Sequence, residues 1–323
     1  MFLLELFTLK TLYFKNVFCR KIIVTWQTYV FLYYNYAPTI MRQDLIDKGY
    51  IPFDKSWMIR MGILDLLDGY DDSIRFLESH YDELSDDLKS LHRASIQWGG
   101  QRTIDVGESA TLYRYLRFAS WKLGKNKEFV LQGTLKTRNI CDDPSIINLS
   151  LEELLKLDNG TSQWASAAVL IGNREIVPEP PYKLQVTYDA IEHWKSMREK
   201  GEIWKPRFDE TILAQASAYL QWLEEGKMDF TPQQAEDYCF SRAFNLMTAE
   251  EGERRWSSLK GHESDRITEM ERELQERIVI TRDHRVIQAI AMLRQSKANF
   301  VHPDCVKKSW PQFWRFLENS PDL

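Results

Sequence analysis

The sequence lacks the features that mark metal-binding, disulfide-stabilised and nucleic-acid-binding proteins. Its four cysteines, Cys19, Cys141, Cys239 and Cys305, are scattered, with no CxxC pair and no histidine at zinc-ligand spacing. We therefore expect reduced thiols and neither a metal nor another cofactor. The formal net charge is −5, whereas binding nucleic acid requires a basic face. A local basic site for a small anion stays open, because net charge does not determine local potential.

The first forty residues differ from the rest and allow three interpretations. They are crowded with Phe, Tyr, Leu and Ile, and residues 22–41 contain no charge, which is about the length of a membrane span. Polar residues and Pro38 interrupt that stretch. Residues 1–40 are a non-native extension ahead of a start at Met41, a membrane or interface anchor, or a packing segment. The hydrophobic fraction of 44% supports a full core, so global disorder is excluded.

From Ile51 onward, short apolar segments alternate with stretches of helical period. This alternation predicts an α/β or α+β architecture. The predicted helices are residues 57–67, 71–91, 111–123, 162–171, 188–200, 212–223, 235–247, 264–276 and 284–293. The predicted strands are residues 129–133, 183–187 and 277–280.

Several predicted helices begin with a Ser, Thr or Asp cap and a nearby cation. The cases are Lys55-Ser56 with Arg60, Ser109 with Arg114, Asp265-Arg266, and Asp283-His284-Arg285, while Thr161-Ser162-Gln163 has an amide in place of the cation. A cation at the partly positive start of a helix is unfavourable, whereas free backbone N–H groups there bind phosphate and carboxylate well. The pattern predicts a binding site for a polyanionic small molecule.

Seven motifs resemble those of EPSP synthases (3-phosphoshikimate 1-carboxyvinyltransferases), in that family's order. In this sequence they are Pro52–Arg60, Glu108–Arg114, Gly133–Arg138, Thr161-Ser162-Gln163, His262–Arg266, Asp283-His284-Arg285 and Lys307–Pro311. The resemblance implies a two-domain fold of βαβαββ units, with helix N-termini facing a cleft between the domains and one unit reduced. It implies a first domain of residues 56–205 and a second, shortened domain of residues 41–55 and 206–323.

The same resemblance implies a reaction between two small-molecule substrates. The enolpyruvyl group of phosphoenolpyruvate would pass to the 5-hydroxyl of shikimate 3-phosphate, with release of phosphate. The enzyme would be a cytoplasmic monomer. By family position, phosphoenolpyruvate would meet Lys55, Ala110, Arg138, Gln163, Glu263, Arg266, Arg285 and Lys308. Lys55 would lie between both substrates and donate a proton, and Glu263 would move a proton to and from the methylene carbon.

The acceptor side departs most from the family. By family position, the acceptor would be bound by Lys55, Ser56, Arg60, Thr161, Ser162, Gln163 and His262. The usual Lys is replaced by His262, which titrates near neutrality, and the chain is short between Tyr182 and His262. The catalytic base is therefore either Asp237 or Asp209. Two alternatives stay open: another phosphorylated acceptor, or a catalytically silent binding protein.

Overall fold

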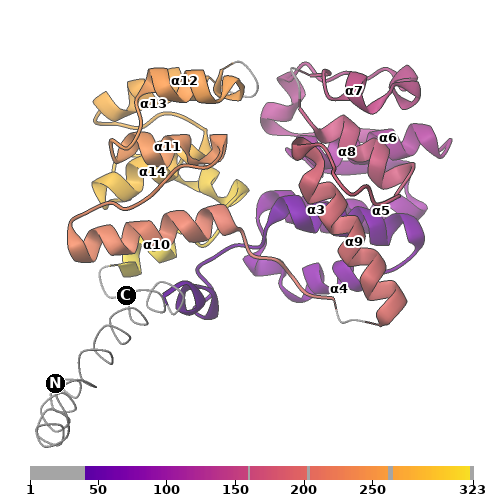
Figure 1. The fold of residues 1–323 in the computed structure, drawn as a ribbon, viewed down its shortest axis with the longest axis horizontal. Coiled ribbons are helices and arrows are strands. Elements are labelled where there is room, and N and C mark those ends of the chain that lie inside the picture. The colour runs from indigo at the N-terminus through magenta and orange to yellow at the C-terminus, as the bar shows by residue number, and fades with distance from the viewer. Residues whose placement is uncertain (1–40, 159–160, 202–203, 261–264, 321–323) are drawn as a thin grey trace, which may run out of the picture. The chain divides into compact units, whose positions relative to one another are not determined.

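The computed structural model describes residues 41–158, 161–201, 204–260 and 265–320 (Figure 1). Backbone contacts divide the chain into residues 1–47 and residues 48–323. Residues 41–47 are helical. All the elements named below belong to residues 48–323.

Most described residues are helical. The α-helices are α3 (Lys55–Asp68), α4 (Asp72–Ser79), α5 (Asp86–Gly100), α6 (Ala110–Lys122), α7 (Leu151–Leu154), α8 (Gln163–Ile171), α9 (Gln185–Lys200), α10 (Glu210–Glu225), α11 (Tyr238–Ala243), α12 (Ala249–Arg255), α13 (Arg266–Gln275), α14 (His284–Arg294) and α15 (Phe313–Asn319). The 3₁₀ helices are η1 (Tyr81–Glu83), η2 (Gly133–Thr137), η3 (Pro144–Asn148), η4 (Tyr182–Leu184), η5 (Ala235–Asp237), η6 (Ser257–Leu259) and η7 (Pro303–Lys308).

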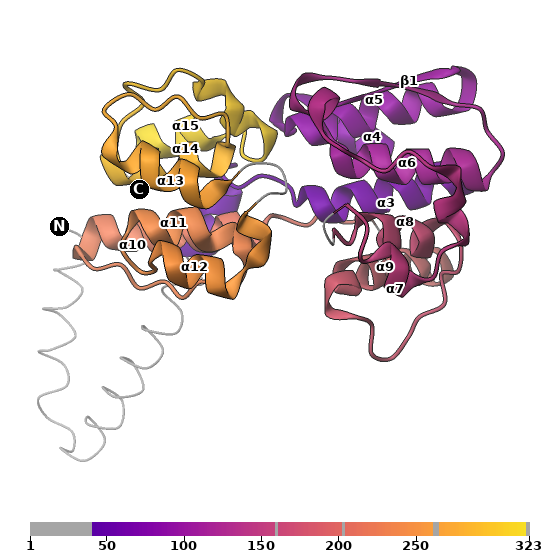
Figure 2. The same cartoon turned by 90° about the horizontal axis from the view of Figure 1, so that it is seen from above.

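Helix α3 is the centre of the first group of helices. It packs against α4, α5, α6, α8 and α9, which surround it in both views (Figures 1 and 2). Its side chains, such as Met58 and Ile63, are fully buried, each contributing about 1.5–3 kcal/mol. One hydrophobic core extends from Phe53 to Met197. This core fixes the position of Lys55, the first residue of α3.

Helix α14 is the centre of the second group. It packs against α11, α13, α15 and η7, and Val286, Ile290 and Ala291 on it are fully buried. Its cap is Asp283, whose carboxylate accepts a hydrogen bond from the backbone N–H of Arg285 at 2.9 Å, as expected at a helix start. The packing of α14 therefore determines where its charged first turn lies.

The predicted fold of βαβαββ units is wrong. Within the described ranges, the only sheet is a parallel pair of short strands, β1 (Thr103–Gly107) and β2 (Glu128–Leu131), joined through α6. Thr103 pairs with Glu128, and the register shifts between Asp105 and Gly107. A two-stranded sheet cannot form the repeated sheets that the alternating pattern predicted. The protein is instead mostly helical.

Individual elements show why the strand predictions fell short. Residues 183–187 belong to η4 and the first turns of α9, and Leu184 and Thr187, three positions apart, are both fully buried. Such spacing suits one face of a helix. Residues 277–280 contribute only an isolated bridge between Val279 and Phe300. The strand predicted at 129–133 overlaps β2, while β1 was not predicted.

The helix predictions mostly hold. Residues 71–91, predicted as a helical stretch with a loop, form α4, η1 and the start of α5, and residues 235–247 form η5 and α11. No helix in the described ranges has the length and apolar character needed to cross a membrane. Residues 1–40, with their three interpretations, lie outside the described residues.

Two chain segments far apart in sequence meet next to the start of α3. Phe53 and Phe208 form an isolated antiparallel bridge. The N–H of Asp54 donates to the carbonyl of Arg207 at 2.7 Å, and the N–H of Asp209 donates to that of Pro52 at 2.9 Å. The caps of α3 and α10, Asp54 and Asp209, therefore lie beside each other.

Candidate functional site

Lys55 is the first residue of α3 and forms an ion pair with α5. Its Nζ lies 3.0 Å from Oδ2 of Asp87, in the first turn of α5, and the Asp87 side chain is only 10% exposed. Burial alone would raise the pKa of Asp87. The charges of Lys55 and Lys308 outweigh it and lower that pKa, as opposite charges nearby do. The starts of α3 and α5 and the end of η7 therefore meet at one carboxylate.

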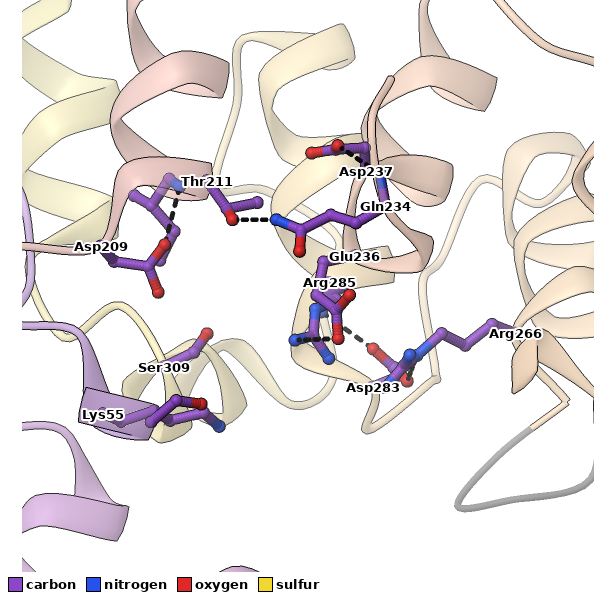
Figure 3. A network of polar contacts seen from close by, with 12 residues as sticks. Lys55, Asp209, Thr211, Gln234, Glu236, Asp237, Arg266, Asp283, Arg285 and Ser309 are labelled. Atoms are coloured by element: carbon purple, nitrogen blue, oxygen red, sulfur yellow. Dashed lines mark hydrogen bonds and ion pairs between the residues drawn. The ribbon is translucent and has the colours of Figure 1, made fainter. Parts of the chain in front are cut away.

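Asp209 provides a second carboxylate near Lys55. Figure 3 shows its side chain on the same side as Lys55, Ser309 and Arg285. Asp209 caps α10 by accepting from the N–H of Ile212 at 3.0 Å. Burial and the charge of Asp54 raise its pKa to about 6, and the charges of Arg285 and Lys55 only partly oppose them. Asp209 can therefore exchange a proton near neutral pH.

Two arginines predicted from the motifs lie close to each other in the second helix group. Nε of Arg266 lies 2.9 Å from Oδ2 of Asp283, and Arg285 lies 3.5 Å from Oε1 of Glu236 (Figure 3). Burial alone would raise the pKa of Asp283, but the Arg266 guanidinium holds it well below its usual range. For Glu236 the charges of Arg285, Arg266 and Lys55 likewise lower the pKa against burial. Glu236 thus connects the two arginines to Lys55.

His284 lies among the same charges. It is buried, and its Nε2 has no hydrogen-bond partner among the described residues. Burial lowers its pKa strongly, the charges of Arg285, Lys55 and Lys308 add to that effect, and the charge of Asp283 partly opposes it. This surrounding therefore favours the neutral imidazole.

Most of these groups lie at the starts of five helices, α3, α5, α10, α13 and α14, while Glu236 lies in η5 and Lys308 ends η7. We call the set of side chains the Lys55 cluster. It consists of Lys55, Asp87, Asp209, Glu236, Arg266, Asp283, His284, Arg285 and Lys308. Helix N-termini add partial positive charge to the four cations, while the carboxylates already neutralise most of it. An arriving anion would therefore share the cations with these carboxylates.

Arg60 provides a second cation with a different surrounding. It is 6% exposed, yet it donates to neutral oxygens: the carbonyl of Ser56 at 2.7 Å and the hydroxyl of Thr187 at 2.8 Å. A third, longer bond of 3.4 Å reaches the hydroxyl of Ser166. The buried hydroxyl of Tyr115, whose ring lies below the guanidinium, has no partner among the described residues. A buried cation bonded to neutral groups favours an anion nearby.

Other residues predicted for the site take part in local structure. Gln163 accepts a hydrogen bond from Arg114, which is paired with Asp158 at 2.8 Å, both side chains being 8% exposed. Arg138 donates to the hydroxyl of Thr134 at 3.4 Å. Gln163 and Arg138 therefore form hydrogen bonds with residues outside the Lys55 cluster.

The remaining predicted residues lie at helix starts or outside the described residues. Ala110 is the buried first residue of α6, and Ser162 is the cap of α8 without a side-chain capping bond. The hydroxyl of Thr161 accepts from the N–H of Gln163 at 3.4 Å. Glu263 and His262 fall in residues 261–264, outside the described ranges. The predicted proton shuttle by Glu263 stays a prediction.

The structure separates the two candidates for the base. Asp237 is 3% exposed, and its carboxylate accepts from the side chain of Gln215 at 2.9 Å and from two backbone N–H groups of residues 233 and 234. The two backbone bonds stabilise the start of η5, and the bond from Gln215 joins η5 to α10. Asp209 is the one that faces Lys55 (Figure 3).

Sequence reasoning did not predict four members of the Lys55 cluster as site residues. Asp87 and Glu236 were not named as site residues, and His284 and Asp283 were noted only within a motif. A sequence signal was available for Asp87, because the pair Asp86-Asp87 directly follows Ser85 at a helix start. Glu236 carries no such signal, because only the packing of η5 brings it to Arg285.

Comparisons with known proteins give no support beyond the motifs. No family model, curated protein or solved structure matches this chain. Within the described ranges, no group of three or more His, Cys, Asp and Glu side chains could hold a metal ion, and Cys141, Cys239 and Cys305 are free thiols. Any function must be argued from the charges themselves.

Proposed function

We propose that this chain binds phosphoenolpyruvate at the Lys55 cluster and transfers its enolpyruvyl group to a hydroxyl of a phosphorylated acceptor, with shikimate 3-phosphate as the first candidate. One observation carries the proposal. Four cations selected from separate motifs, Lys55, Arg266, Arg285 and Lys308, act on the same few carboxylates. Segments more than 200 residues apart in sequence thus contribute to one charged site.

The chemistry of the donor fits this charge distribution. Phosphoenolpyruvate carries a phosphate and a carboxylate, and arginine binds either group through two parallel hydrogen bonds. Arg266 and Arg285 would bind the carboxylate, and Lys55 and Lys308 the phosphate. Because the cations come from packed helix starts, they need little reorganisation when charge develops in the reaction.

The transfer also requires a proton donor and a base. The methylene carbon gains a proton while the acceptor oxygen attacks C2 and loses its proton. The tetrahedral intermediate then loses phosphate from C2 and a proton from the new methyl group, which restores the C=CH2 double bond in the product. We assign Asp209 as the base, because its pKa of about 6 is close to the working pH of a neutral cell. Lys55, beside it, would donate the proton to the methylene carbon.

Arg60 would serve the acceptor. Among the described residues, its buried guanidinium donates hydrogen bonds to three neutral oxygens, and its charge also acts on the Asp54 carboxylate. A carboxylate or phosphate of the acceptor would add a hydrogen-bonded counter-charge. The scattered cysteines favour the cytoplasm. A monomer with small-molecule substrates stays a prediction.

A second candidate is an anion-binding protein without catalysis. The observation that favours it is the number of carboxylates around the cations: Asp87, Asp209, Glu236 and Asp283 already neutralise much of the site. Such a protein would bind phosphoenolpyruvate or a similar anion and release no phosphate.

The test measures binding and phosphate release separately in the purified full chain. We expect calorimetry to detect phosphoenolpyruvate binding, and phosphate to appear only when shikimate 3-phosphate is added. Lys55→Met should abolish both signals, and the exposed Arg75→Met should change neither. Binding without release on any phosphorylated acceptor would favour the second candidate. The absence of binding would disprove both.

A further inference from the structure

Asp87 holds Lys55 in the way that a ligand phosphate would. Its Oδ2 lies 3.0 Å from Nζ of Lys55, a normal length for a charge-assisted hydrogen bond. Asp87 is 7% exposed, so little water screens this pair. The charge of Lys308 also lowers the pKa of Asp87. Two of the four cations proposed for the donor therefore act on one internal carboxylate.

The surroundings of Asp87 contain other charges. Asp86 precedes it on α5 and is exposed, and the charges that act on Asp86 include those of Lys89, Lys307 and Glu108. Ser109, the cap of α6, is the remaining polar neighbour whose effect on Asp87 is resolved. Lys55 and Lys308 are thus the cations that Asp87 neutralises.

We propose that Asp87 is an internal counterion of the anion site, which occupies Lys55 in place of a ligand phosphate and weakens the binding of highly charged ligands. This inference rests on the proposed function, because it takes the Lys55 cluster as the place where the ligand binds. A ligand anion must either displace the Asp87 carboxylate from Lys55 or bind beside it.

The size of the effect follows from charge. A unit charge a few ångströms from a ligand anion, at a partly buried site, changes the affinity by about tenfold or more for each ligand charge. Removing the charge of Asp87 should therefore tighten binding most for the most highly charged ligand. The loss of Asp87 should at the same time destabilise the ligand-free protein, because Lys55 then loses its hydrogen-bonded ion-pair partner.

The experiment compares the wild-type chain with Asp87→Asn by calorimetry and thermal unfolding. The probes are phosphoenolpyruvate, inorganic phosphate and pyruvate, which differ in negative charge. We expect the Kd of phosphoenolpyruvate to fall about tenfold or more in Asp87→Asn, with smaller gains for phosphate and the smallest for pyruvate. The melting temperature should fall without ligand and rise further on ligand addition than in the wild type.

Two variants separate charge from shape. Asp87→Glu keeps the charge and should bind all three probes within about threefold of the wild type, and Asp86→Asn should do the same. If Asp87→Asn does not fold, Asp87→Ser, which leaves room for water beside Lys55, gives the same test.

The outcomes distinguish this inference from the proposed function. If the wild type binds phosphoenolpyruvate and a folded neutral variant binds it no more tightly, the role of Asp87 is wrong and the proposed function stands. If neither the wild type nor a folded neutral variant binds any probe, both are wrong. Equal gains for all three probes would show that Asp87 acts through shape, which also overturns the inference.

Discussion

Two arginine–carboxylate pairs in this protein look similar. They differ in how completely hydrogen bonds satisfy their charged groups and in how exposed they are to solvent. Arg114 and Asp158 form a buried pair in which the carboxylate also accepts from the indole of Trp164 at 2.9 Å and from the N–H of Cys141 at 3.0 Å. Arg285 and Glu236 are 3.5 Å apart, with side chains 21% and 41% exposed. The first arrangement is closed by its own hydrogen bonds, and the second is open to solvent.

The difference teaches how to separate structure from function among motif residues. Arg114, a member of the closed pair, also donates a hydrogen bond to the side chain of Gln163. Packing therefore explains why these two residues stand at their motif positions. Arg285 and Lys55 belong to a set in which four cations share four carboxylates, from the starts of α5, α10 and α14 and from η5. Charges that are grouped, accessible and incompletely bonded favour ligand binding.

The largest effect is expected at the closed pair. Arg114→Met would leave Asp158 buried and uncompensated, so we expect a loss of about 3–5 kcal/mol in the free energy of unfolding. Urea denaturation measures it. A loss below about 1 kcal/mol would show that this pair is not closed, and the distinction between the two arrangements would fail.

The open arrangement should respond in binding and hardly in stability. Arg285→Met removes one of the two arginines proposed for the ligand carboxylate, so we expect about a hundredfold weaker binding of phosphoenolpyruvate by calorimetry. Its partly exposed pair with Glu236 is worth about 1 kcal/mol or less to folding. If Arg285→Met lost stability and kept its affinity for phosphoenolpyruvate, Arg285 would have a structural role like that of Arg114.

The smallest effect concerns Asp209 and pH. A carboxyl whose pKa is raised on folding favours the folded state below its unfolded pKa, and this contribution is lost as pH rises. With a pKa of about 6, the loss falls between about pH 4 and 6. Because asparagine caps a helix as well as aspartate does, Asp209→Asn should be about 1–3 kcal/mol more stable at pH 7.

Asp265 is the matched control for that prediction. It caps α13 by accepting from the N–H of Thr268 at 3.0 Å, as Asp209 caps α10. Its exposed carboxylate has a lowered pKa, owing first to that backbone hydrogen bond. Asp265→Asn should therefore lose stability above about pH 4. Equal pH profiles for the two variants, measured by thermal unfolding, would contradict the assigned surroundings of Asp209.

Helix starts were more predictable than the fold. Lys55, Arg266 and Arg285 stand at helix starts, which have local signatures: a capping side chain followed by a helical period. Asp209 was one of two candidate bases that the family resemblance left open. The sheets were wrong, because a short apolar segment between helices reads alike as a strand or as a helix start. Residues 183–187, which form η4 and the start of α9, illustrate that ambiguity.

The sequence by itself determined where helices begin and which cations stand at their first turns, since both depend on neighbours within about four residues. Only the tertiary structure decided which of those starts meet. The pairing of Lys55 with Asp87 and the nearness of Asp209 to Asp54 depend on helix packing and on the bridge between Phe53 and Phe208. Such contacts between distant segments leave no local pattern in the chain, because they form only when the hydrophobic faces of the helices are buried together.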